Sequence, residues 1–143
     1  MKKQSLFYLV FALLLVSCGN NSLSEKVINT YENGQPSKVY FFDKEGQLVV
    51  EKDYYDTGAL MMEGPMANGV RNGEWISYFP DGKVQSTGVF KDGISVGKTR
   101  VYYENGNLWM DGFYKDDDHK CGEWVFYDEQ GYELNRVDYG SCD

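Results

Sequence analysis

The sequence has little of the residue types that build metal centres, catalytic triads or nucleic-acid interfaces. Its 143 residues include one His and three Cys, so no site that needs two histidines can form within one chain. The 14 Lys and Arg are outnumbered by 22 Asp and Glu, and the net charge is −8. Phosphate contacts need clustered basic side chains, so this balance argues against nucleic-acid binding.

Proline is scarce as well. The three prolines are accompanied by 16 Gly and 12 Tyr. Disordered segments are poor in aromatic residues, which supply large buried areas, so this composition favours a folded chain. The length fits one ordinary domain and not two.

The chain also lacks a long apolar run. The run from Leu6 to Val16 holds eleven residues including Tyr8, whereas a membrane-spanning helix needs about 20. A basic start at Lys2 and Lys3, a short apolar stretch and then small residues are typical of a secretory signal. We expect residues 1–17 to be a signal peptide with an N-terminal signal helix.

The end of this run, Leu15-Val16-Ser17-Cys18, resembles a bacterial lipobox. The resemblance implies that Cys18 is the lipid attachment site, carries palmitate and becomes the mature N-terminus. An ordinary signal peptide with an incidental Cys is the alternative. Residues 18–29 are then a lipidated N-terminus and polar tether. The location implied is the cell envelope. The outer membrane is favoured over the inner, because Gly19 stands where an Asp resembles an inner-membrane retention signal.

The remainder is one unit repeated. Glycines recur at a spacing of 24 residues, and once of 25, in the series Gly34, Gly58, Gly82, Gly106 and Gly131. Each closes a turn signature, and β-branched and aromatic stretches separate the turns. No stretch of the mature chain, from Cys18 onward, shows sustained apolar spacing of three and four residues, so we expect almost no helix there. We therefore predict an all-β fold over residues 30–143. It is an elongated single-layer array of antiparallel β-hairpins, with about four units and a C-terminal half unit.

Aromatic residues keep the same period. We expect them to form the repeat core, because a thin array has few other ways to bury area. The predicted core residues are Tyr54, Trp75, Tyr78, Phe79, Tyr102, Tyr103, Trp124 and Tyr127. Exposure of some of these rings in a row is the alternative, and it would suit a protein or glycan partner.

A second glycine series, Gly64, Gly88 and Gly112, falls inside the predicted strands. We expect these glycines to mark bulges or places where an aromatic ring of the next unit lies on bare backbone. Trp75 and Trp124 are the rings expected to cover them. Thr99 holds the Trp position in the unit between, and Glu51 holds it in the degenerate first unit.

The stretch Gly73-Glu74-Trp75-Ile76-Ser77-Tyr78-Phe79-Pro80-Asp81-Gly82-Lys83-Val84 resembles the MORN-repeat variant of bacteria, and the pattern starts again at Gly97 and Gly122. The resemblance covers about residues 31–139 and implies the hairpin array. Bacterial chains of this type include the YwqK-like antitoxin-type repeat family. Similar repeats in eukaryotes are associated with membrane attachment, scaffolding and dimerisation.

Two candidate sites lie near the C-terminus. Cys121 and Cys142 form a candidate disulfide across the last hairpin, with two free thiols as the alternative. Asp116, Asp117, Asp118 and His119 are interpreted as a solvated loop, because consecutive Asp side chains do not converge on one ion without a special turn. We expect no metal and no cofactor.

These features predict a non-catalytic, lipid-anchored envelope protein that uses its repeat surface for protein binding or scaffolding. An antitoxin-like or immunity-like inhibitor, or a glycan or cell-wall binding module, is the alternative. The expected partners are the membrane, through Cys18, and a protein of unknown identity. A second copy could also pair at an open sheet end, because exposed strand edges are adhesive.

Overall fold

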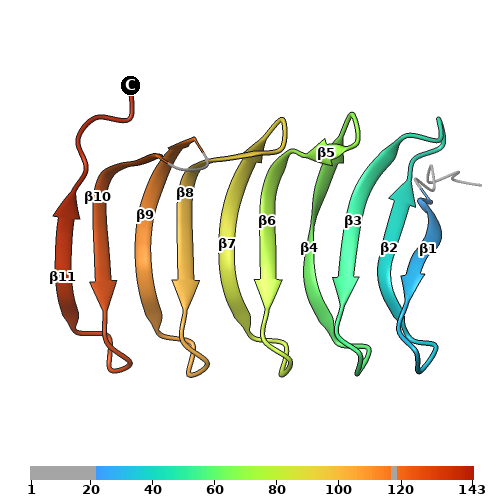
Figure 1. Ribbon diagram of the computed structural model, residues 1–143, viewed down its shortest axis with the longest axis horizontal. Coiled ribbons are helices and arrows are strands. Elements are labelled where there is room, and N and C mark those ends of the chain that lie inside the picture. The colour runs from blue at the N-terminus through green and yellow to red at the C-terminus, as the bar shows by residue number, and fades with distance from the viewer. Residues whose placement is uncertain (1–21, 117–118) are drawn as a thin grey trace, which may run out of the picture.

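The computed structural model describes residues 22–116 and 119–143. The predicted signal helix, Cys18, Asp117 and Asp118 lie outside these residues. The described chain folds into one antiparallel sheet in which sequence neighbours are also neighbours in space (Figure 1). The order is β1-β2-β3-β4-β6-β7-β8-β9-β10-β11, and the short strand β5 pairs with β4 outside this path.

The strands follow each other with short turns and no crossover. Their bounds are β1 Ser24–Thr30, β2 Pro36–Phe42, β3 Leu48–Tyr54, β4 Leu60–Ala67, β5 Val70–Arg71, β6 Gly73–Tyr78, β7 Val84–Lys91, β8 Ile94–Tyr102, β9 Leu108–Asp116, β10 His119–Tyr127 and β11 Glu133–Asp138. The prediction of an all-β hairpin array is confirmed, and no helix occurs in the described residues. Among these residues, accordingly, no helix has the length and apolar character to cross a membrane.

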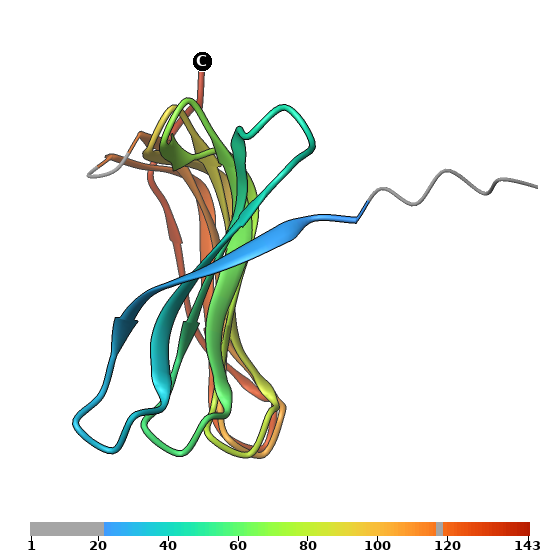
Figure 2. The same cartoon turned by 90° about the vertical axis from the view of Figure 1, so that its right-hand side faces the viewer.

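The sheet begins earlier in the chain than predicted. Strand β1 starts at Ser24, within the segment 18–29 assigned to the tether, and pairs with β2 from Ser24↔Phe42 to Thr30↔Pro36. Every residue of β1 is exposed, so the strand has no buried side chain that sequence reading could detect. It turns away from the neighbouring strands at a steep angle (Figure 2).

Two kinds of turn connect the strands at their two ends. At one end each turn contains a glycine with a φ value between 82° and 89°, and these glycines are Gly34, Gly58, Gly82, Gly106 and Gly131. At the other end Asn68-Gly69 and Asp92-Gly93 have positive φ at both residues, as type I′ hairpin turns require. The alternation of these turns gives the 24-residue unit its two strands.

The buried interior is small because the sheet has no second layer (Figure 2). The buried apolar residues are Val39, Trp75, Cys121, Trp124 and Val125. Of the eight predicted core aromatics, Trp75 and Trp124 are buried, whereas Tyr54, Tyr78, Phe79, Tyr102, Tyr103 and Tyr127 are half-buried. One side of each tyrosine column faces solvent, because no second sheet covers it.

Candidate functional site: the tryptophan face

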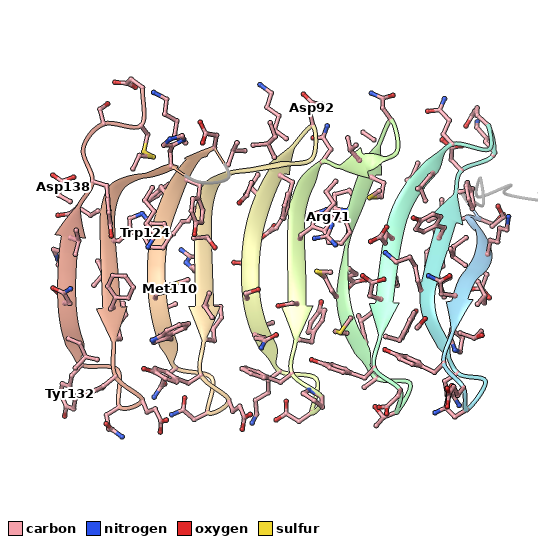
Figure 3. The ribbon with its side chains drawn as sticks, in the orientation of Figure 1. Arg71, Asp92, Met110, Trp124, Tyr132 and Asp138 are labelled. Atoms are coloured by element: carbon pink, nitrogen blue, oxygen red, sulfur yellow. A yellow bond between two sulfur atoms is a disulfide. The ribbon has the colours of Figure 1, made fainter. Side chains whose placement is uncertain are left out.

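The register of the strands shows which of the periodically spaced side chains share a face of the sheet. Trp75 pairs with Gly88, Ser86 with Val101, Thr99 with Gly112, and Met110 with Phe126. Because alternate residues of a strand share a face, these pairs place Trp75, Thr99 and Trp124 on one face. We call this face, which bears Trp75 and Trp124, the tryptophan face. In Figure 3 the labelled side chains of Arg71, Met110 and Trp124 lie over the strands, between the two rows of turns.

Each tryptophan lies flat on a glycine of the neighbouring strand that precedes it in the sheet. A Cβ on Gly64 would lie 2.3 Å from Cδ2 of Trp75, and a Cβ on Gly112 would lie 2.2 Å from Cδ2 of Trp124. Each indole N–H donates to the next backbone carbonyl, Trp75 to Pro65 O and Trp124 to Phe113 O, both at 3.0 Å. The prediction that aromatic rings cover the strand glycines is confirmed for Gly64 and Gly112 and is wrong for Gly88, which no ring covers.

Basic side chains and rings extend the two tryptophan sites. The Arg71 guanidinium lies 4.1 Å from the Trp75 ring centre, and Lys120 Nζ lies 4.4 Å from that of Trp124. Phe90 contacts Trp75 edge to face at 6.1 Å, and Tyr114 contacts Trp124 at 5.0 Å. Such contacts hold the rings in fixed orientations on a surface that would otherwise be mobile.

The first unit carries charge where later units carry tryptophan. Glu51 is 4% exposed and Asp53 7%. Lys38 Nζ lies 2.7 Å from Glu51 and 3.2 Å from Asp53, and Arg71 lies 3.7 Å from Glu51. Burial alone would lower the pKa of Lys38, but its hydrogen bond to Glu51 and its ion pair with Asp53 outweigh burial and raise that pKa. The charges are therefore compensated within the sheet.

The third unit leaves an opening on the same face. Thr99 is too short to cover Gly88, and a Cβ on Gly88 would meet only Thr99 Oγ1 at 4.0 Å. A hollow of about 180 Å³ lies here, lined among others by Trp75, Gly88, Phe90, Ser95 and Thr99. The tryptophan face thus alternates between covered and open glycine positions.

The opposite face carries ion pairs, and we call it the ion-pair face. Lys52 lies 2.8 Å from Glu63, Lys98 3.1 Å from Asp111, and Arg136 2.8 Å from Glu123. They link neighbouring strands and leave the carboxylates spread along the sheet, not gathered at one point.

One of these pairs extends to a third strand. Glu63 accepts hydrogen bonds from Lys52 and from Tyr78 Oη. The bond from Lys52, aided by the bond from Tyr78, lowers the pKa of Glu63 against the effect of burial. Burial and the hydrogen bond to Glu63 raise the pKa of Tyr78.

The tyrosines at the start of each unit join successive turns. The hydroxyls of Tyr31, Tyr55 and Tyr103 donate to the carbonyls of Tyr54, Tyr78 and Tyr127 at 2.7–2.9 Å. Phe79 occupies this column without a hydroxyl. These tyrosines therefore link successive turns of the sheet.

The C-terminal end is closed by a disulfide. Cys121 and Cys142 are bonded, with their Cα atoms 5.0 Å apart. Backbone bonds between Gly122 and both Tyr139 and Gly140 continue the pairing beyond β11. Near this end His119 Nδ1 hydrogen-bonds to Asp116. No group of three metal-binding side chains gathers in the ranges that the structure covers.

Residues 71–92 and 95–116 match a known family, described as the MORN repeat variant. These two segments resemble MORN repeats. The first matched MORN repeat holds Arg71, Trp75 and Gly88, and the second holds Thr99 and Gly112. The comparison with curated proteins found no significant match.

Sequence reading of the repeated units missed three residues of the tryptophan face: Arg71, Phe90 and Lys120. A signal for the cations was present, because Arg71 precedes Trp75 by four residues and Lys120 precedes Trp124 by four. The period also aligns Phe90 with Tyr114, 24 residues later. That these side chains meet the indoles depends on register, which the repeat period alone does not give.

Proposed function

We propose that this MORN-repeat chain is a non-catalytic, lipid-anchored envelope protein whose tryptophan face binds or scaffolds another protein. The observation that carries the proposal is the row of oriented rings and cations on one face, interrupted by the hollow at Gly88. Aromatic and Arg side chains are enriched where proteins bind each other, because they supply large rigid contact areas.

Two further features support this function. MORN repeats are not typically catalytic, and the ionisable groups of the ion-pair face are engaged in links between strands. The Leu15-Val16-Ser17-Cys18 pattern supplies the anchor. An acidic body is repelled by anionic lipid, so the acyl chains would hold the protein at the membrane.

The test is crosslinking in cells, followed by recovery of the tagged processed protein and of Cys18→Ala. We expect palmitate labelling, membrane fractionation and partner recovery in the unsubstituted protein, and loss of all three in Cys18→Ala. Cys142→Ser is the matched cysteine control and should remain labelled and in the membrane fraction. Recovery of the same partners from unanchored Cys18→Ala would contradict the role of the anchor.

A further inference from the structure

We propose that the hollow over Gly88 receives a planar aromatic side chain, best an indole, from a protein partner. This inference rests on the proposed function, since it names the chemistry of the partner that the tryptophan face would bind. The chain itself supplies the templates, because the two flanking MORN-type units fill the equivalent position with their own tryptophans.

The equivalence follows from the columns of the repeat. Gly64, Gly88 and Gly112 are each 24 residues apart, as are Pro65, Val89 and Phe113. In the outer two units the glycine is the floor for an indole, and the carbonyl of the next residue accepts the indole N–H at 3.0 Å. The middle unit keeps the glycine floor and has the carbonyl of Val89 at the acceptor position.

The middle unit lacks only the ring. Thr99 stands in the tryptophan column, and its Oγ1 donates to Thr87 O at 3.3 Å. The space above Gly88 is open, with a volume of about 180 Å³. An enclosed apolar cavity of about 150 Å³ is enough to bind benzene, so a six-membered ring has room here.

The walls of the hollow suit an aromatic guest. Phe90 aligns with Tyr114, which meets Trp124 edge to face at 5.0 Å, so Phe90 would meet a ring on Gly88 in the same way. Trp75 and Arg71 also line the hollow and are stacked on each other. A fixed aromatic wall beside a flat glycine floor favours a planar ring over a branched aliphatic side chain.

The Gly88→Ala substitution separates ring binding from folding. The φ angle of Gly88 is not positive, and a Cβ there has no neighbour closer than 4.0 Å, so the alanine fits the fold. The same methyl group would collide with a ring seated on residue 88, as a Cβ on Gly64 would collide with Trp75. Thr99→Trp is a second variant, which would fill the hollow with the chain's own indole. Val84→Ala, at an exposed position of β7 outside the lining of the hollow, is the matched control.

The experiment is NMR titration of the processed chain, residues 18–143 with Cys18→Ser, with N-acetyl-L-tryptophanamide as the probe. We expect saturable shifts of the amides of Gly88, Ser95 and Thr99, with millimolar affinity, as is usual for a single side chain. Gly88→Ala and Thr99→Trp should each weaken binding at least tenfold, while Val84→Ala should leave it unchanged. The same spectra report whether each variant is folded. If either Gly88→Ala or Thr99→Trp is unfolded, the binding result of the folded variant decides the test.

The proposal is overturned if the probe gives no saturable shifts or if N-acetyl-L-leucinamide binds equally well. It is also overturned if Gly88→Ala and Thr99→Trp both bind the probe normally. Saturation by methyl β-N-acetylglucosaminide without saturation by the indole would assign the hollow to a glycan. If the probe does not bind but a protein partner is still recovered in a Cys18-dependent manner, the proposed function stands and only the binding of an aromatic side chain at Gly88 is overturned.

Discussion

At the residue scale, the fold rests on pairs of one glycine and one tryptophan. A tryptophan buries about 150–250 Å², which at about 25 cal/mol per Å² contributes about 4–6 kcal/mol before entropic costs. This contact requires hydrogen in place of a side chain on Gly64 and Gly112, because the ring atoms of Trp75 and Trp124 occupy the Cβ position. In a sheet with so few buried residues, two such pairs are a large share of the interior.

These pairs predict that alanine has opposite effects at equivalent glycines. Gly64→Ala and Gly112→Ala should each lower the free energy of unfolding by about 1–3 kcal/mol, because overpacking forces the indole away. Gly88→Ala should leave it unchanged or raise it by up to about 1 kcal/mol, because alanine restricts the unfolded chain. Urea denaturation of the three variants measures the difference. Equal destabilisation by all three would show that glycine is needed for its backbone and not for ring contact.

At the element scale, successive hairpins are linked by the tyrosine hydroxyls at their turns. Tyr31, Tyr55 and Tyr103 each donate to the carbonyl of the residue just before the next turn, whereas Phe79 cannot. Between the third and fourth turns, Lys83 Nζ instead donates to Glu104 O at 2.8 Å. Phe79 is therefore the one position of this repeated series at which the hydroxyl-to-carbonyl hydrogen bond is missing.

Phe79→Tyr should restore this link. The new hydroxyl is expected to bond to Tyr102 O, 23 residues on, as Tyr31 and Tyr55 do to carbonyls 23 residues on. A net gain of about 0.5–1.5 kcal/mol in unfolding free energy is expected from one hydrogen bond. Thermal denaturation measures the gain, and Tyr55→Phe is the matched loss. A Phe79→Tyr protein no more stable than the parent would contradict the equivalence of the turns.

The elements also show how much of the structure can be predicted from the sequence. Turn glycines and the tryptophan–glycine contact could be predicted, because both repeat at a fixed period and have local steric causes. The strand β1 could not, because its exposed residues are ordered by pairing with β2 and not by a hydrophobic pattern. Nor could Arg71 be placed on Trp75, since that contact depends on the position of β5 beside β4.

At the scale of the whole molecule, the two faces of one thin sheet have different chemistry. The tryptophan face gathers rings, two stacked cations and a hollow, whereas the ion-pair face is occupied by links such as Lys98–Asp111. The ion-pair face also exposes Trp109 and Phe113, so the presence of aromatic residues does not by itself distinguish the faces. The distinguishing feature is the open glycine floor beside fixed rings.

The claim that the tryptophan face binds the partner is tested most directly by site-specific photocrosslinking in cells. A benzoylphenylalanine replaces either Phe90, on the tryptophan face, or Phe113, on the ion-pair face, so that each substitution exchanges one aromatic residue for another. The account predicts a discrete protein adduct from position 90 and none from position 113, provided that Cys18 is intact. An adduct from position 113 alone, or equal adducts from both positions, would contradict it.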